Sequence, residues 1–184
     1  MSARPTAQGP EVAVREAGMA TRADFDFSAE VTMAGGAAAR RNWEVLEAHM
    51  VAEWSCDLDA TMATITRADP FQVMHATGLH VRGWDNVREF YRRRMETFQG
   101  QGFFARRWVV ADEVIVGNGQ FRGTPKGVFF GTPTGGKRLC LPMTVWIYFG
   151  DGLLRGEATY LDGLELRRQI EHGAPDGAES EAVW

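Results

Sequence analysis

Two side chains are candidates for moving a proton on a bound substrate. His75 ends a short run of alternating apolar and polar residues, and a neutral imidazole near neutral pH can accept a proton. Glu157 lies in a later alternating run, where removal from water would raise the pKa of its carboxyl group. Each also has a plain structural interpretation, His75 as a packed histidine and Glu157 as a surface ion-pair partner.

Tyr91 and two arginines are candidates for stabilising charge on a substrate oxygen. Tyr91 lies on the apolar stripe of a predicted helix, so its ring would pack inside while its hydroxyl makes a hydrogen bond, although core packing alone also explains it. Arg106 and Arg107 are adjacent in a predicted strand, so one faces inward and the other faces solvent. The inward guanidinium would stabilise a developing oxyanion.

Metal and nucleotide sites are not expected. His49 and His80 have no partner at metal-ligand spacing, and neither do the two cysteines. Residues 131–137 match the spacing of a phosphate-binding loop, but Arg138 follows where Ser or Thr would hold magnesium, and a strand follows in place of a helix. We therefore expect neither a metal centre nor a nucleotide cofactor.

Composition indicates one globular domain. The chain has 184 residues, of which 45% are hydrophobic and 24% charged. A net charge of −4 gives no basic surface for nucleic acid, and no apolar run approaches the ~18 residues of a spanning helix. The first 20 residues contain charges and no apolar run, so we expect no secretory signal and a cytoplasmic location. The expected partner is a small molecule.

Helical periodicity predicts three helices in the first half of the domain. The first covers residues 43–53 behind Asn42 as the cap, with Trp54 on the same stripe, and the second begins at Asp57 or Asp59 and ends before residues 69–70. A short strand over residues 71–75 and then Gly83 precede the third helix. Residues 92–94 are expected on its solvated side.

The second half alternates with period two. Strands are predicted over residues 103–110, 114–122, 138–149 and 153–161, with a bulge at residues 117–119 and a tight turn at residues 150–152. A closing helix begins at Asp162, which has Glu165 three residues later in the pattern of a capping box. We divide the chain into an N-terminal arm (residues 1–39), the domain (40–172) and a tail (173–184).

This order of elements resembles the nuclear transport factor 2-like superfamily and, within it, the polyketide-cyclase-like (SnoaL-like) branch. The resemblance covers about residues 43–170. It rests on the sequence Asp57-Leu58-Asp59, on Gly83 with Phe90-Tyr91, on Gly-Thr-Pro-Thr-Gly at residues 131–135, and on Gly150-Asp151-Gly152 followed by Tyr160-Leu161-Asp162.

The resemblance implies an α+β fold in which a cone-shaped, curved antiparallel sheet wraps around a pocket under three N-terminal helices, with a short C-terminal helix. It also implies cofactor-free chemistry, since related proteins include isomerases, cyclases, dehydratases, epoxide hydrolases, lyases of aromatic catabolism and non-catalytic carriers. The positions where such enzymes carry an acid or a base fall on Met74, Val145 and Thr159. We therefore expect a different catalytic set from theirs.

We predict an acid–base enzyme, a lyase or an isomerase, that acts on a small aromatic or cyclic oxygenated molecule. Elimination and retro-aldol cleavage fit the residues present. The alternatives are a small-molecule carrier and an oligomer-assembly module. Besides the candidates above, the predicted pocket residues are Trp54, Met74, Arg82, Trp108, Gln120, Met143, Val145, Ile147 and Thr159. Trp146 and Tyr148 alternate with Val145 and Ile147, so they should lie outside the pocket and form a homo-oligomer interface.

Overall fold

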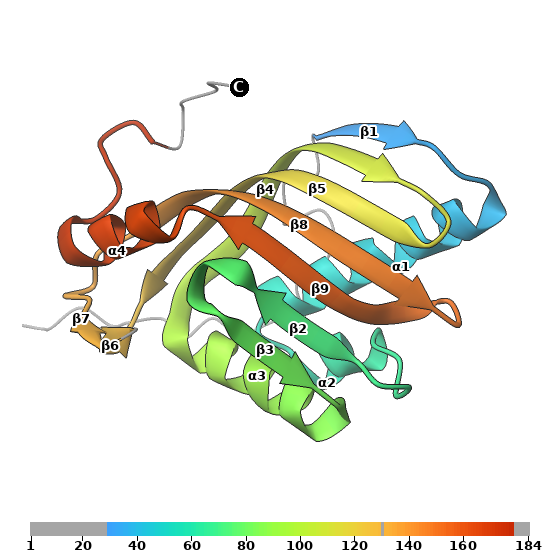
Figure 1. The fold of residues 1–184 in the computed structure, drawn as a ribbon, viewed down its shortest axis with the longest axis horizontal. Helices are drawn as coiled ribbons and strands as arrows, with labels where there is room; N and C mark the ends of the chain where they lie inside the picture. Colours follow the sequence, from blue (N-terminus) through green and yellow to red (C-terminus); the bar gives the residue numbers. More distant parts are fainter. Residues whose placement is uncertain (1–28, 130, 179–184) are drawn as a thin grey trace, which may run out of the picture.

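The computed structural model describes residues 29–129 and 131–178. A curved sheet of seven strands, in the order β1-β4-β5-β8-β9-β2-β3, carries helices α1, α2 and α3 on its concave side (Figure 1). The strands are β1 (Glu30–Met33), β2 (Phe71–Met74), β3 (Leu79–Arg82), β4 (Phe98–Val110), β5 (Val114–Pro125), β8 (Leu139–Gly150) and β9 (Leu153–Leu161). The helices are α1 (Ala37–Trp54), α2 (Leu58–Ala63), α3 (Trp84–Thr97) and α4 (Gly163–His172). A small hairpin pairs β6 (Val128–Phe129) with β7 (Thr132–Pro133).

The sheet is mixed. The four long strands β4, β5, β8 and β9 pair antiparallel in sequence order, as predicted. Two pairs are parallel: β1 lies beside β4, and β2 lies beside β9. The second pairing joins the first half of the domain to the last strand, and its register places Gln72 opposite Glu157 and Met74 opposite Thr159. The α+β architecture predicted from the sequence is confirmed, with parallel edges added.

Asp112 fixes the start of α1 from a distant loop. Its Oδ1 accepts hydrogen bonds from the backbone N–H groups of Gly36 and Ala39, both at 2.9 Å. Asn42, predicted as the cap, is instead a buried residue inside the helix and donates to the backbone oxygen of Asp112. Because the cap comes from the β4–β5 turn, α1 begins six residues earlier than the prediction and is tied directly to the sheet.

Local caps set α2 and α4 where the sequence places them. Asp57 caps α2 by accepting from Ala60, and Asp162 caps α4 by accepting from Leu164 and Glu165. The strand predicted over residues 71–75 ends at Met74, because residues 75–77 turn into a short 3-10 helix. A bulge lies where residues 117–119 predicted one, but the extra residue is Arg106 on the neighbouring strand β4.

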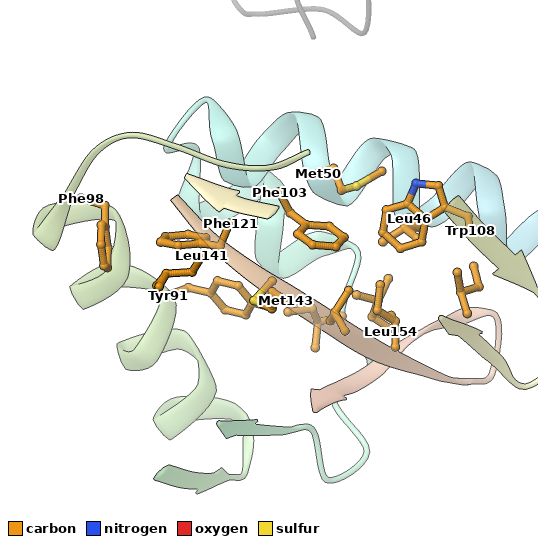
Figure 2. Close-up of a cluster of buried hydrophobic side chains, with 14 of the residues drawn as sticks. Leu46, Met50, Tyr91, Phe98, Phe103, Trp108, Phe121, Leu141, Met143 and Leu154 are labelled. Carbon is orange, nitrogen blue, oxygen red and sulfur yellow. The ribbon is translucent and has the colours of Figure 1, made fainter. Parts of the chain in front are cut away.

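Side chains from α1, α3 and the concave face of the sheet form one core (Figure 2). Val145 and Ile147 point into it, whereas Trp146 lies on the opposite face and is 40% exposed, so the predicted alternation is confirmed for β8. Tyr148 lies on the same outer face and packs against the ring of Phe71. No helix within residues 29–129 and 131–178 has the length and apolar character needed to cross a membrane.

Segments on both sides of the predicted domain boundaries pack against the domain. The boundary drawn at residue 40 lies within α1, and β1 belongs to the segment predicted as an arm. Residues 174–178 of the predicted tail lie against the sheet, where Ala174 donates to Arg138 and the backbone oxygen of Ala178 accepts from Gln120. The rest of the arm, residues 1–28, and residues 179–184 lie outside the described residues.

Gly117 leaves room for the Trp108 ring, and this close approach yields a test of the core. A Cβ atom at position 117 would lie 2.2 Å from Cζ3 of Trp108, a distance that no packed side chain tolerates. We expect Gly117→Ala to lower the free energy of unfolding by about 1–3 kcal/mol in urea denaturation. Gly150→Ala is the matched control, since its new Cβ would be at ordinary contact distance from Arg155 and should change stability little. Equal stability of the two variants would contradict this packing.

Candidate functional site

A cluster of polar side chains lies inside the apolar core. His49 and Glu53 come from α1, Tyr91 from α3, Gln72 from β2 and Glu157 from β9. All five are buried, and their exposed fractions range from 0% for Tyr91 to 6% for Glu157. Buried polar groups are costly unless they are paired, so the contacts within this cluster determine what it can do.

Helix α1 places His49 and Glu53 together because they are one turn apart on its buried stripe. Leu46, His49, Met50 and Glu53 follow the helical spacing of a core-facing surface. Nε2 of His49 lies 3.6 Å from Oε2 of Glu53 and 3.9 Å from Oε1 of Glu157. The helix thus brings an imidazole to the inward carboxylate of the last long strand.

Hydrogen bonds on the other side of the ring fix the tautomer of His49. Nδ1 lies 2.6 Å from the hydroxyl oxygen of Thr64, and that hydroxyl donates its own proton to the backbone oxygen of Thr61. The Thr64 oxygen must therefore accept, so Nδ1 of His49 carries a proton. In the neutral ring Nε2 is then the basic nitrogen, and it faces Tyr91, Glu53 and Glu157.

Tyr91 connects His49 to Glu157. The amide of Gln72 donates to the Tyr91 hydroxyl at 2.7 Å, which leaves the phenolic proton for a second partner. Nε2 of His49 and Oε2 of Glu157 are both 3.3 Å away from this hydroxyl. One phenolic proton therefore faces two acceptors, the arrangement of a short proton relay. Burial, together with the nearby carboxylates of Glu157 and Glu53, holds the pKa of Tyr91 well above its usual range, so the phenol stays protonated.

An ion pair closes the cluster. Nη2 of Arg94 lies 2.9 Å from Oε1 of Glu53, and Nε of Arg94 donates to Gln101. Burial raises the pKa of Glu157 above its usual value; the charges of His49 and Arg94 counteract this, while Glu53 reinforces it. Arg94 offsets the charge of Glu53, so His49 and Glu157 can share one proton with no net buried charge.

Two adjacent cavities that share part of their walls lie beside this cluster. A cavity of about 30 Å³ is lined by His49, Glu53 and Glu157, with Trp54, Trp108, Val145 and Ile147 among its apolar residues. A larger cavity of about 240 Å³ is almost entirely apolar, with Phe90, Phe98, Phe121 and Phe129 in its wall. Both are lined by Arg94, Met143 and Thr159, which places these three residues at the junction.

Most of the predicted pocket residues lie at these cavities. Met74 lines the larger cavity, and Met143 and Thr159 line both. Trp54, Trp108, Val145, Ile147 and Glu157 line the smaller one. Tyr91 is buried between the helices and the sheet and reaches the cluster through its hydroxyl group.

Four predicted candidates lie elsewhere. His75 is exposed on the 3-10 turn and stacks on Tyr160, 4.3 Å between ring centroids, because β2 ends one residue earlier than predicted. Arg107 faces outward and pairs with Glu30, and Arg82 is exposed beside Asp69. Gln120 is buried on the convex side of the sheet under residue Ala178.

The inward arginine is Arg94, not Arg106 or Arg107. Arg106 is the extra residue of the β4 bulge and lines neither cavity, so the simple alternation used for the prediction does not apply there. Arg94 was predicted to be solvated, yet its side chain is only 18% exposed. The first residues of β4 fold back beneath α3, and they cover the last turn of this helix.

Sequence reasoning also missed His49, Glu53 and Gln72. The available signal was the pair of ionisable residues within the apolar stripe of the first helix, at the spacing of one turn. His49 was dismissed because it lacks metal partners, and within the described residues no group of three potential metal ligands occurs. Apart from Glu53 on the same helix, its partners Thr64, Tyr91 and Glu157 come from other parts of the chain.

Comparisons with known proteins agree with the fold described above. The family model of the SnoaL-like polyketide cyclases matches residues 60–170. The chain belongs to this family. Among curated proteins, none matches significantly.

Solved structures show the same fold at low sequence identity. A SnoaL-like polyketide cyclase described as putative, from Jannaschia sp. CCS1, has 18% identity and a TM-score of 0.66 over 76% of this chain and 97% of its own. TsrD from Streptomyces laurentii has 22% identity and a TM-score of 0.60, over 71% and 95%. A polyketide cyclase from Xanthomonas campestris pv. campestris, also described as putative, has 18% identity and a TM-score of 0.63, over 73% and 99%. Family membership points to a cofactor-free cyclase or isomerase type of role.

The cluster predicts a pH-dependent stability that can be measured. A raised pKa in the folded state means that Glu157 is more easily ionised when unfolded, so wild-type stability falls as the pH rises from about 4.5 through the raised value. Glu157→Gln removes this loss. Across this pH range, the free energy of unfolding of Glu157→Gln should increase relative to that of the wild type by about 1.4 kcal/mol for each unit by which burial raises the pKa.

Urea denaturation at several pH values measures this difference. Exposed Glu44→Gln, on the same helix as His49, is the control and should follow the wild type. A Glu157→Gln difference that stays constant or shrinks as the pH rises would show that Glu157 is not held in its protonated form by burial.

Proposed function

We propose that this protein is a cofactor-independent acid–base enzyme, a lyase or an isomerase, which acts on a small aromatic or cyclic oxygenated molecule. One observation carries the proposal: hydrogen bonds connect Glu157 through Tyr91 to His49, and Glu157 and His49 line a small cavity that shares three lining residues with a larger apolar one. A group with a raised pKa beside a pocket is the usual arrangement for general acid–base catalysis. A cavity wall of aromatic rings suits a ring-shaped substrate.

The proton shared by His49 and Glu157 defines the reaction step. When His49 holds it, Glu157 is a carboxylate in an apolar environment and can remove a proton from a substrate carbon. The substrate C–H electron pair then forms a carbon–carbon double bond, and charge moves to an oxygen of the substrate. The proton can be returned at a second carbon, which gives isomerisation, or to a leaving group on the neighbouring carbon, which gives elimination. In retro-aldol cleavage Glu157 would instead remove the proton of a substrate hydroxyl group, the carbon–carbon bond would break to give a carbonyl group and an enolate, and the proton would return to the enolate carbon.

The dimensions of the two cavities limit the substrate. About 240 Å³ accommodates a molecule of one or two rings, whereas the 30 Å³ cavity has room for a water molecule or for one small substituent. The ring system therefore lies in the larger cavity, and the reacting group points past Thr159 toward Glu157. By the family resemblance, Met74, Val145 and Thr159 fall at the positions where related enzymes carry their acids and bases, and the register places Met74 and Val145 on either side of Thr159. The acid–base role passes to Glu157, one inward position along β9 from Thr159.

Hydrogen exchange tests the proposal without knowledge of the natural substrate. A panel of cyclic and aromatic ketones and aldehydes is incubated with the protein in D₂O, and deuterium uptake next to the carbonyl group is followed by NMR. We expect the wild type to accelerate exchange in at least one compound. Glu157→Gln and His49→Ala should each reduce that rate by about 10²-fold or more.

His75→Ala is the matched histidine control, because this residue is exposed and lines neither cavity. Its exchange rate should stay within about threefold of the wild-type rate. Unchanged rates in Glu157→Gln and His49→Ala would refute the assignment, and saturable binding with no exchange in any protein would favour the carrier function.

We also propose that two copies of the chain pair through the convex face of the sheet. Val109, Trp146 and Tyr160 are each at least 40% exposed, and they lie on three different strands of this face. Exposed aromatic residues gathered on one face favour association. Light scattering at micromolar concentration should give a dimer for the wild type and a monomer for Trp146→Glu. Val128→Glu, an equally drastic change on the separate hairpin, should leave the dimer intact; a monomeric wild type would refute the proposal.

A further inference from the structure

Arg94 has hydrogen-bonding capacity that the protein does not use. Its Nε donates to Gln101 and its Nη2 pairs with Glu53, while the guanidinium carbon lies 5.5 Å from the centre of the Phe121 ring. Within the described residues, no hydrogen bond or ion pair involves Nη1. A guanidinium has five N–H groups in one plane, so donors remain for a ligand.

The residue that carries these donors lies between the two cavities. Arg94 lines both of them, as do Met143 and Thr159. A ring in the larger cavity with its reacting group near Glu157 must pass this junction, so an oxygen attached to the ring or beside it comes within reach of Arg94. Thr159 already donates its hydroxyl proton to the backbone oxygen of Val73. Of the three residues that line both cavities, Arg94 is therefore the one that can donate a hydrogen bond to a substrate oxygen.

The charge of Arg94 is already balanced. Glu53 is buried and lies 2.9 Å from Nη2, and Glu157 is close enough to raise the pKa of the guanidinium further, against the effect of burial. An anionic group at the junction would add a negative charge beside two buried carboxyl groups. A neutral carbonyl oxygen accepts the same hydrogen bond without adding charge.

We infer that Arg94 is the specificity residue of this site and that the Arg94–Glu53 pair makes it select a neutral carbonyl oxygen over a carboxylate of the same size. This inference rests on the proposed function for the position of the substrate. During the reaction the charge that leaves Glu157 on protonation appears on the substrate oxygen beside Arg94, so the total charge of the site is constant. The Arg94–Glu53 pair is therefore electrostatically compatible both with the bound neutral substrate and with the transition state.

Equilibrium binding of two matched probes tests the inference. Acetonaphthone and naphthoate share a ring system and differ in whether the side group is a ketone or a carboxylate. Calorimetric titration near neutral pH should show wild type binding the ketone about tenfold tighter or more. Arg94→Lys keeps a cation for Glu53 but removes the Nη1 donor, and it should weaken ketone binding about tenfold. Arg92→Met, an exposed residue two positions earlier that lines neither cavity, should bind as the wild type does.

Glu53→Gln gives the sharpest outcome, because it leaves the guanidinium without its counter-charge. The preference should then reverse, with naphthoate binding tighter than the ketone. The inference is overturned if the wild type prefers naphthoate, if it shows no saturable binding of the ketone, if Arg94→Lys binds the ketone unchanged, or if Glu53→Gln keeps the ketone preference. Binding requires no proton transfer, so these results are independent of the exchange rates of the His49 and Glu157 variants.

Discussion

A polar cluster in the interior of this small domain depends on one ion pair, that of Arg94 with Glu53. Without the guanidinium, Glu53 would be an uncompensated buried charge, which costs several kcal/mol in typical proteins. With it, the remaining ionisable groups, His49 and Glu157, need only one proton between them to be neutral overall. Catalysis by a shared proton becomes possible because the pair removes the electrostatic reason for either group to leave the interior.

Contacts of the sheet with α1 and between β2 and β9 position the residues of this polar cluster. Asp112, in the turn between β4 and β5, anchors the start of α1, while the parallel pairing of β2 with β9 places Gln72 opposite Glu157. Gln72 then orients Tyr91, and Thr64 orients His49. Tyr91 and His49 are thus each oriented by a neighbour that takes no part in the proton transfer. The proposed proton path runs across elements far apart in the sequence.

Sequence reasoning recovered the elements that local chemistry determines. Asp57 and Asp162 cap the helices they were expected to cap, the four long strands pair as predicted, and the family assignment is confirmed. What failed were features set by contacts between distant residues. The bulge at Arg106 changes the alternation of β4, the early end of β2 turns His75 outward, and α3 packs so that Arg94 is covered. Glu157 was found because strand alternation is local. His49 was missed because, apart from Glu53, its partners come from other elements.

The central claim is that Nδ1 of His49 is fixed as a donor while Nε2 takes part in a proton shared with Glu157. Nitrogen-15 NMR of protein labelled at histidine measures both ring nitrogens directly. The structure predicts that Nδ1 of His49 stays protonated in wild type and in Glu157→Gln, whereas the Nε2 resonance shifts between the two proteins because its proton-sharing partner has been replaced. An unprotonated Nδ1, or an Nε2 resonance unaffected by Glu157→Gln, would contradict the account.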